Sequence, residues 1–103
     1  MIVSAWNDNN HFETGEGYGI RIRIEDKHYF NRNWTSVRIR IYGRPDFTAP
    51  ITESFWRNCH EIRDKNIGQW FIYLKHRYWR KGHTPKFELI HLDDNLFELR
   101  KTR

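Results

Sequence analysis

The chain is poor in the residues that stabilise small secreted or metal-bound domains. Its 103 residues include a single cysteine, Cys59, together with only three prolines and six glycines. One cysteine cannot form an intrachain disulfide and cannot supply a multi-cysteine zinc site. A lone cysteine is typical of a protein in a reducing compartment, so we expect a cytoplasmic location.

The sequence also lacks a long apolar run. A transmembrane helix needs about 18 or more consecutive apolar residues, and no segment approaches that length. The first ten residues contain no lysine or arginine and only a short apolar stretch, which differs from a secretory signal peptide. We therefore expect neither a membrane partner nor a cleaved leader.

Aromatic and basic side chains are abundant instead. Five Trp, five Tyr and seven Phe supply enough apolar surface to build a folded core, which argues against disorder. The formal net charge is +5, from 18 basic and 13 acidic residues. Residues 1–18 contain three of the acidic residues and no lysine or arginine, so the rest of the chain is more basic than the total suggests. The length fits one domain spanning residues 1–103.

Alternation of apolar and polar residues predicts several β-strands. Met1–Trp6 is a short apolar segment that ends at a run of turn-forming residues. Ile20–Ile24 and Val37–Ile41 alternate aliphatic residues with arginines, the pattern of half-buried strands, and we interpret them as an antiparallel pair. Phe87–Leu99 has the pattern of a β-hairpin around an Asp-Asp-Asn turn.

The middle of the chain has helical periodicity. Thr52 or Ser54 can cap a first helix of about residues 53–64, and apolar residues at helical spacing predict a second helix of about residues 67–78. Strands precede and follow these helices. This order predicts an α+β fold, in which a small antiparallel sheet carries one or two helices on one face.

The arginines of the two central strands are the main functional signal. If the aliphatic residues face the core, four arginines project from the opposite face: Arg21, Arg23, Arg38 and Arg40. Neighbouring strands would gather them into one patch, and guanidinium groups suit phosphate because their planar fork makes two parallel hydrogen bonds. In the alternative interpretation they are paired with carboxylates on adjacent strands, such as Glu25, Glu88 or Glu98.

Aromatic residues lie beside basic ones in two predicted loops. Tyr29 lies between the arginine strands, and Trp79 is followed by Arg80 and Lys81. Aromatic rings next to cations are how proteins hold single-stranded nucleic acid without reading its sequence. These four residues join the four strand arginines as the predicted nucleic-acid-binding set.

No arrangement of residues specifies a reaction, a cofactor or a metal. The glycine-punctuated segment of residues 15–19 leads into a strand, whereas a phosphate-binding glycine loop opens a helix, so a turn is favoured. His60 and Asp64 are only two potential metal ligands, and Cys59 is expected to be a small buried side chain. The sequence therefore predicts no cofactor or metal and leans against catalysis.

Three functions remain open. The favoured one is a small basic module that binds nucleic acid, either DNA or RNA, or another polyanion. The second is a protein-interaction or homodimerisation module with Trp, Tyr and Arg at the interface. The third is a metal-dependent nuclease that would use Glu25, Asp26, Glu61 or Asp64.

Overall fold

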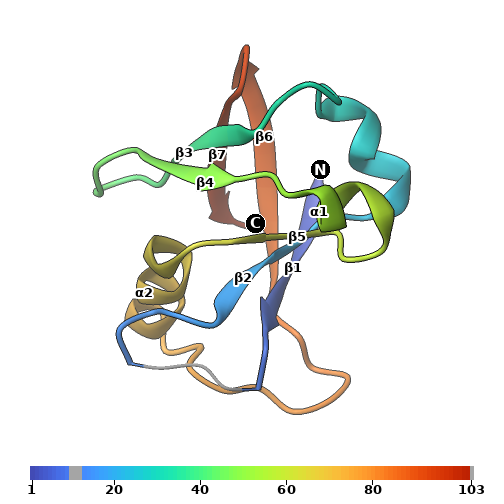
Figure 1. Cartoon of the computed structure of the whole chain (residues 1–103). Coiled ribbons are helices and arrows are strands. Elements are labelled where there is room, and N and C mark those ends of the chain that lie inside the picture. The colour runs from blue at the N-terminus through green and yellow to red at the C-terminus, as the bar shows by residue number, and fades with distance from the viewer. Residues whose placement is uncertain (10–12, 103) are drawn as a thin grey trace.

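The protein is described by a computed structural model that covers residues 1–9 and 13–102. The strands span Ile2–Asn7 (β1), Tyr18–Arg21 (β2), Ser36–Arg40 (β3), Phe47–Pro50 (β4), Glu61–Arg63 (β5), Lys86–Asp93 (β6) and Leu96–Lys101 (β7). The helices span Ile24–Tyr29 (η1, a 3-10 helix), Glu53–Arg57 (α1) and Lys65–Tyr73 (α2). The strands form one seven-stranded mixed sheet in the order β4-β3-β7-β6-β1-β2-β5 (Figure 1). The predicted α+β class is confirmed, with a larger sheet than expected.

The sheet curls around its own core. Along β1, Val3 and Ala5 are buried, whereas Ser4 and Trp6 between and after them face outward. The two edge strands, β4 and β5, approach each other, so the sheet forms an incomplete barrel (Figure 1). Helix α2 packs against β2. The inner face is therefore dry and apolar, and the outer face is where polar and charged side chains can act.

The prediction that the two arginine-bearing strands form an antiparallel pair is wrong. β7, β6 and β1 lie between β2 and β3 in the sheet. β3 pairs instead with β4 and, in parallel, with β7, where Ile39 lies opposite Phe97. The alternation of apolar and polar residues indicates which side chains face inward. It does not depend on which strand lies alongside, so it does not predict the order of strands in the sheet.

The predicted strand Ile20–Ile24 overlaps β2 only at Ile20 and Arg21, because β2 begins earlier, at Tyr18. β2 ends at Arg21, Ile22 is still buried, and η1 begins at Ile24, whose side chain is 69% exposed. The second predicted strand, Val37–Ile41, agrees with β3 to within one residue at each end. The alternating pattern therefore predicted both strands but placed the first two to three residues too far along the chain.

The predicted helix of residues 53–64 is correct only in its first part. α1 ends at Arg57, and β5 then adds to the free edge of β2, where Ile62 lies opposite Ile20. His60 and Asp64 consequently flank a strand instead of sharing one helix face. Pairing with an open strand edge, a long-range contact, has overridden the local helical spacing.

The second predicted helix, of residues 67–78, is confirmed as α2 with shifted ends. Asp64 caps its start by accepting a hydrogen bond of 2.8 Å from the Asn66 amide. The helix stops after Tyr73 because Lys75 adopts a left-handed conformation, with φ 69°, and the His76 amide donates to the Phe71 carbonyl at 2.8 Å. In the described part of the chain, no helix is both long enough and apolar enough to span a membrane.

The C-terminal hairpin predicted over Phe87–Leu99 is confirmed. β6 and β7 pair antiparallel around a turn at Asp94 and Asn95, and they form the middle of the sheet (Figure 1). β6 also pairs with β1, where Phe87 lies opposite Val3. The outer face can therefore be divided at this hairpin into two halves. One half is centred on β3 and β7, and the other is centred on β1, β2 and β5.

Candidate functional site

The four strand arginines do not form one patch. Arg21 and Arg23 lie at and just after β2, whereas Arg38 and Arg40 lie on β3, four strand spacings or roughly 19 Å away along the sheet. All four side chains are exposed, as predicted. Their assembly into one phosphate site was wrong because it required β2 and β3 to be neighbours.

The half of the outer face around β3 and β7 has balanced charges. Arg40 makes two hydrogen bonds to the Asp46 carboxylate, at 3.1 and 3.0 Å, and they hold the pKa of Asp46 below its usual range. Arg100 forms ion pairs with Glu88 at 3.1 Å and Glu98 at 3.6 Å. With Arg38 included, three cations face three carboxylates. The alternative interpretation, that strand arginines are paired with acids, therefore holds for Arg40, whose partner is Asp46 and not Glu25, Glu88 or Glu98. Arg38 makes no ion pair with the described residues.

The half around β1, β2 and β5 has the opposite balance. Two rows of outward-facing side chains cross these strands, and each row follows the pairing register. The first row contains Lys86, Ser4, Arg21 and Glu61, and the second contains Trp6, Gly19 and Arg63. Among these described residues, three are cations and one is a carboxylate.

Glu61 is the organising group of this half. Its side chain is only 5% exposed, and its two oxygens accept hydrogen bonds from Arg21 at 3.3 Å and Arg63 at 3.2 Å. The two guanidinium groups are themselves about half exposed. Glu61 thus holds two arginines in fixed positions while most of their donors still face solvent.

Trp6 and Arg63 form a stacked pair across the sheet. The guanidinium carbon of Arg63 lies 4.3 Å from the centre of the Trp6 ring, although β2 separates their strands. The residue between them is Gly19, which has no side chain to obstruct this contact, and a Cβ there would lie 2.4 Å from the Ile62 carbonyl oxygen. The missing side chain at position 19 therefore allows both close strand packing and the cation–π contact.

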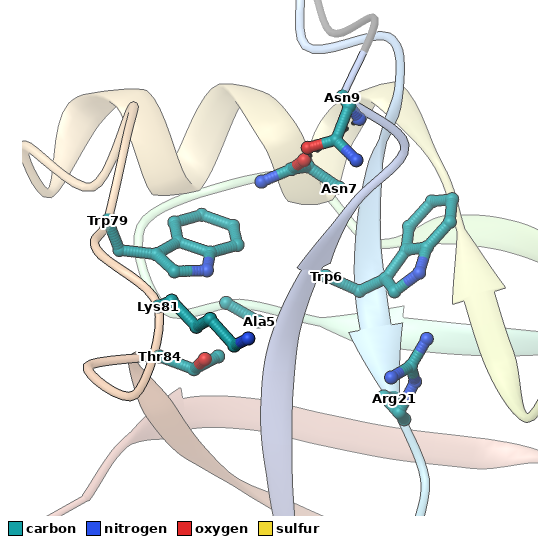
Figure 2. A pocket seen from close by; sticks show the side chains of 8 residues that line it. All are labelled: Ala5, Trp6, Asn7, Asn9, Arg21, Trp79, Lys81 and Thr84. Carbon is teal, nitrogen blue, oxygen red and sulfur yellow. Dashed lines mark hydrogen bonds between the residues drawn. The ribbon is translucent and has the colours of Figure 1, made fainter.

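The segment between α2 and β6 supplies the other wall of the site. Figure 2 shows Trp79 on one side of β1 and Trp6 on the other, with Lys81 and Arg21 near them. These side chains border an open depression of about 470 Å³, which is lined by Ala5, Trp6, Asn7, Asn9, Arg21, Trp79, Lys81 and Thr84. We call Trp6, Arg21, Arg63, Trp79, Lys81 and Lys86 the basic-aromatic surface.

Two contacts fasten the Trp79 segment to the sheet. The Tyr18 hydroxyl donates to the Arg77 carbonyl at 2.8 Å, and the Ala5 amide donates to the Pro85 carbonyl at 2.9 Å. Trp79 itself is partly buried and packs against the core. The loop that carries Trp79 and Lys81 is therefore held at both ends, so its side chains keep a defined position beside β1.

Three of the eight predicted binding residues come together here, namely Arg21, Trp79 and Lys81. Tyr29 is in η1, where its ring lies 4.3 Å from that of His28, and Arg23 is the residue before η1. Arg38 and Arg40 belong to the balanced half. Arg80 is exposed in the Trp79 segment but is not among the described residues that line the depression.

Sequence reasoning missed Trp6 and Arg63. Trp6 follows Val3 and Ala5 at odd spacing in the predicted strand Met1–Trp6, so the alternation itself contained the signal that it faces outward. Arg63 was placed in a helix, and nothing local to it indicates a partner in β1. Its role depends on the β1-β2-β5 order.

The carboxylates considered for metal-dependent cleavage have other roles. Glu61 is bonded to two arginines, Asp64 caps α2, and Glu25 and Asp26 lie in the first turn of η1. Within residues 1–9 and 13–102, no three His, Cys, Asp or Glu side chains are grouped closely enough to hold a metal ion. The structure therefore offers the nuclease hypothesis no assembled site among the described residues.

No protein-family model, curated protein or solved structure matches this chain. Its function has to be inferred from the surface itself.

Replacing Tyr18 by phenylalanine tests how the Trp79 segment is fastened. Burial raises the pKa of the Tyr18 phenol, the nearby Tyr78 raises it further and Arg77 partly offsets the rise. Because the folded-state pKa is raised, the stability that Tyr18 contributes is present below about pH 10 and is lost as the pH rises through the folded-state value. Tyr18→Phe should cost about 1 kcal/mol at neutral pH, through the lost hydrogen bond.

The measurement is urea unfolding of both proteins at neutral and alkaline pH. The stability difference between the natural protein and Tyr18→Phe should shrink above about pH 10, because only the natural protein has this phenol to ionise. A difference that stays constant across the alkaline range contradicts the assigned role of Tyr18.

Proposed function

We propose that this protein is a small nucleic-acid-binding module and that the basic-aromatic surface is its interface. The observation that supports this is a charge asymmetry within one sheet face. On the outer face around β3 and β7, Arg40 and Arg100 are ion-paired with three carboxylates, whereas Glu61 is the one described carboxylate that pairs with any of the four cations of the basic-aromatic surface. Two tryptophans, Trp6 and Trp79, line the same depression as two of these cations, Arg21 and Lys81 (Figure 2).

Excess positive charge of this kind favours a polyanion. A phosphate chain that contacts Lys and Arg side chains releases condensed counterions, and that release supplies sequence-independent affinity. Arg21 uses its Nε for Glu61 and Arg63 uses one terminal nitrogen, so further N–H donors of both groups remain for phosphate oxygens. Lys81 and Lys86 are exposed point charges beside them.

A second candidate function, self-association or binding of another protein, has its own supporting observation. Tyr42 and Tyr73 are 97% and 70% exposed, and they border a depression of about 490 Å³ together with Trp70, Leu74 and Leu99. This depression shares no described lining residue with the one at Trp6. A sizing column run over a range of protein concentrations tests it, since self-association would shift the elution volume.

The nucleic-acid proposal is tested by removing cations in matched pairs. The surface variant combines Lys81→Gln with Lys86→Gln, which leaves both arginine partners of Glu61 in place. The control combines Arg38→Gln with Lys101→Gln on β3 and β7, which lowers the net charge equally. Affinity for a labelled oligonucleotide is measured by fluorescence anisotropy over a series of salt concentrations.

The surface variant should bind about tenfold more weakly, and its salt slope should fall by roughly 1.5, because two phosphate contacts are lost. The control should change affinity less than about twofold, since screening weakens distant charges. Glu61→Gln should strengthen binding, because it removes the negative charge that pairs with Arg21 and Arg63 while the amide oxygen of Gln can still accept a hydrogen bond from them. Equal weakening in surface and control variants, or no binding at low salt, would show that the proposal is wrong.

A further inference from the structure

Trp6 occupies an unusual position for so large an apolar side chain. Trp70 is buried, and Trp34, Trp56 and Trp79 are partly buried and packed against the core. Within the described residues, Trp6 neither belongs to the core nor packs against it, and its ring borders the open depression. Trp6 is therefore a half-buried ring at the surface that is not part of the apolar core.

The ring of Trp6 is nevertheless held in place. Arg63 lies over it at 4.3 Å, and Arg63 is in turn bonded to the nearly buried Glu61 at 3.2 Å. A ring that is already fixed by such contacts loses little rotational freedom when a ligand stacks on it. The affinity gained by stacking is therefore not offset by an entropy cost of ordering the Trp6 side chain. The pair forms a preassembled platform at the border of the depression.

Cations and rings alternate in a way that matches a nucleotide. Trp6 pairs in register with Gly19, and the next outward row pairs Ser4 with Arg21, about 7 Å further along the strands. Across β1, Trp79 and Lys81 repeat the combination of ring and cation (Figure 2). A nucleotide likewise presents a flat base and a charged phosphate separated by about this distance.

The shape of the site favours unpaired over paired bases. In a duplex, the faces of the bases are stacked on each other and only their edges are reached through the grooves. Reading a groove takes a projecting helix or β-ribbon, and no described residue that lines the depression belongs to a helix. Unpaired bases expose their faces and can stack on aromatic side chains.

We infer that the basic-aromatic surface binds single-stranded nucleic acid, with unpaired bases stacked against Trp6 and Trp79 and neighbouring phosphates held by Arg21 and Lys81. This inference rests on the proposed function and narrows its substrate to unpaired strands. Asn7 and Thr84, at the border of the same depression, provide an amide and a hydroxyl for the base edges. Sequence preference is expected to be weak, because every base has a face that can stack.

The experiment separates stacking from charge. Four labelled probes of equal length are compared by anisotropy: oligothymidylate, oligouridylate, a duplex, and a chain of abasic sites that has the phosphates but no bases. The variant Trp6→Leu removes the ring and keeps an apolar side chain. The matched control is Tyr42→Leu, which removes an aromatic side chain that is 97% exposed and lies outside the surface.

Oligothymidylate and oligouridylate should each bind at least about tenfold more tightly than the abasic chain and the duplex. If the site distinguishes deoxyribose from ribose, only one of these two probes should show that difference. Trp6→Leu should weaken the unpaired probes about tenfold and leave the abasic chain within twofold, while Tyr42→Leu changes neither. Equal binding of all probes, with no effect of Trp6→Leu, would overturn the single-strand inference while polyanion binding survives. Absence of salt-dependent binding to every probe would overturn both.

Discussion

Replacing Gly68 by alanine is expected to destabilise the protein by about 3 kcal/mol, although this change inside an exposed helix normally stabilises it by about 1 kcal/mol. Gly68 lies in α2 and faces Gly15. A Cβ at position 68 would stand 2.1 Å from the Gly15 carbonyl oxygen and 2.7 Å from its Cα. Gly15 itself has φ 98°, and these are backbone atoms that cannot rotate away. The helix and the segment before β2 must therefore separate.

Urea unfolding measures this effect, with Tyr73→Ala as the control in the same helix. Tyr73 is 70% exposed, so its truncation should change the free energy of unfolding by no more than about 1 kcal/mol. A neutral or stabilising Gly68→Ala would mean that the contact between α2 and Gly15 is not made. The glycine-punctuated segment of residues 15–19, expected to be a turn and not a phosphate loop, has its role in this close packing.

Truncating Phe97 to alanine is expected to cost about 4 kcal/mol in the free energy of unfolding. Phe97 is fully buried on β7, near the middle of the sheet. Its ring stacks on Phe30 at 4.9 Å and on His91 at 4.7 Å, and it meets Trp34 edge to face at 6.1 Å. Phe30 and Trp34, which lie in sequence between the two predicted arginine-bearing strands, therefore contribute to this cluster in the core.

The measurement pairs unfolding with oligonucleotide binding. If Phe97→Ala is too unstable to purify, Phe97→Leu should show a smaller loss of about 1.5 kcal/mol in the same direction. At a temperature where the variant remains folded, its affinity for an unpaired probe should equal that of the natural protein, because β6 lies between β7 and the β1 strand that carries Trp6. A stability loss below about 1 kcal/mol for the alanine variant would contradict the central packing role of Phe97.

Several elements were predictable because their signals are local. The alternation in β3 assigned Val37 and Ile39 to the core and Arg38 and Arg40 to the surface, and the structure agrees. The hairpin of β6 and β7 needs only two alternating segments and a turn between them. Helix α2 needs only a capping Asp64 and an apolar stripe, although its end at Tyr73 depended on a left-handed residue that nothing in the spacing indicated.

The candidate site was only partly predictable. Trp79 and Lys81 were identified because aromatic and basic residues adjoin there in sequence. Trp6 and Arg63, which contact each other, are 57 positions apart in the chain. These two meet because β5 joined β2 in place of extending a helix, and because Gly19 leaves the space between them open. Such contacts depend on strand order, which local periodicity does not encode.

The amino-acid sequence by itself determined the inward and outward faces of the strands, the basic character of the surface and the α+β class, since each follows from spacing and composition. Only the tertiary structure decided which cations share a neighbourhood. It separated the arginines of β2 from those of β3, paired Arg40 with Asp46, and placed Arg21 in one depression with two tryptophans. Screening limits charge interactions at the surface to about 10 Å, and stacking needs direct contact. Folding sets those distances by bringing together residues that are remote in the chain.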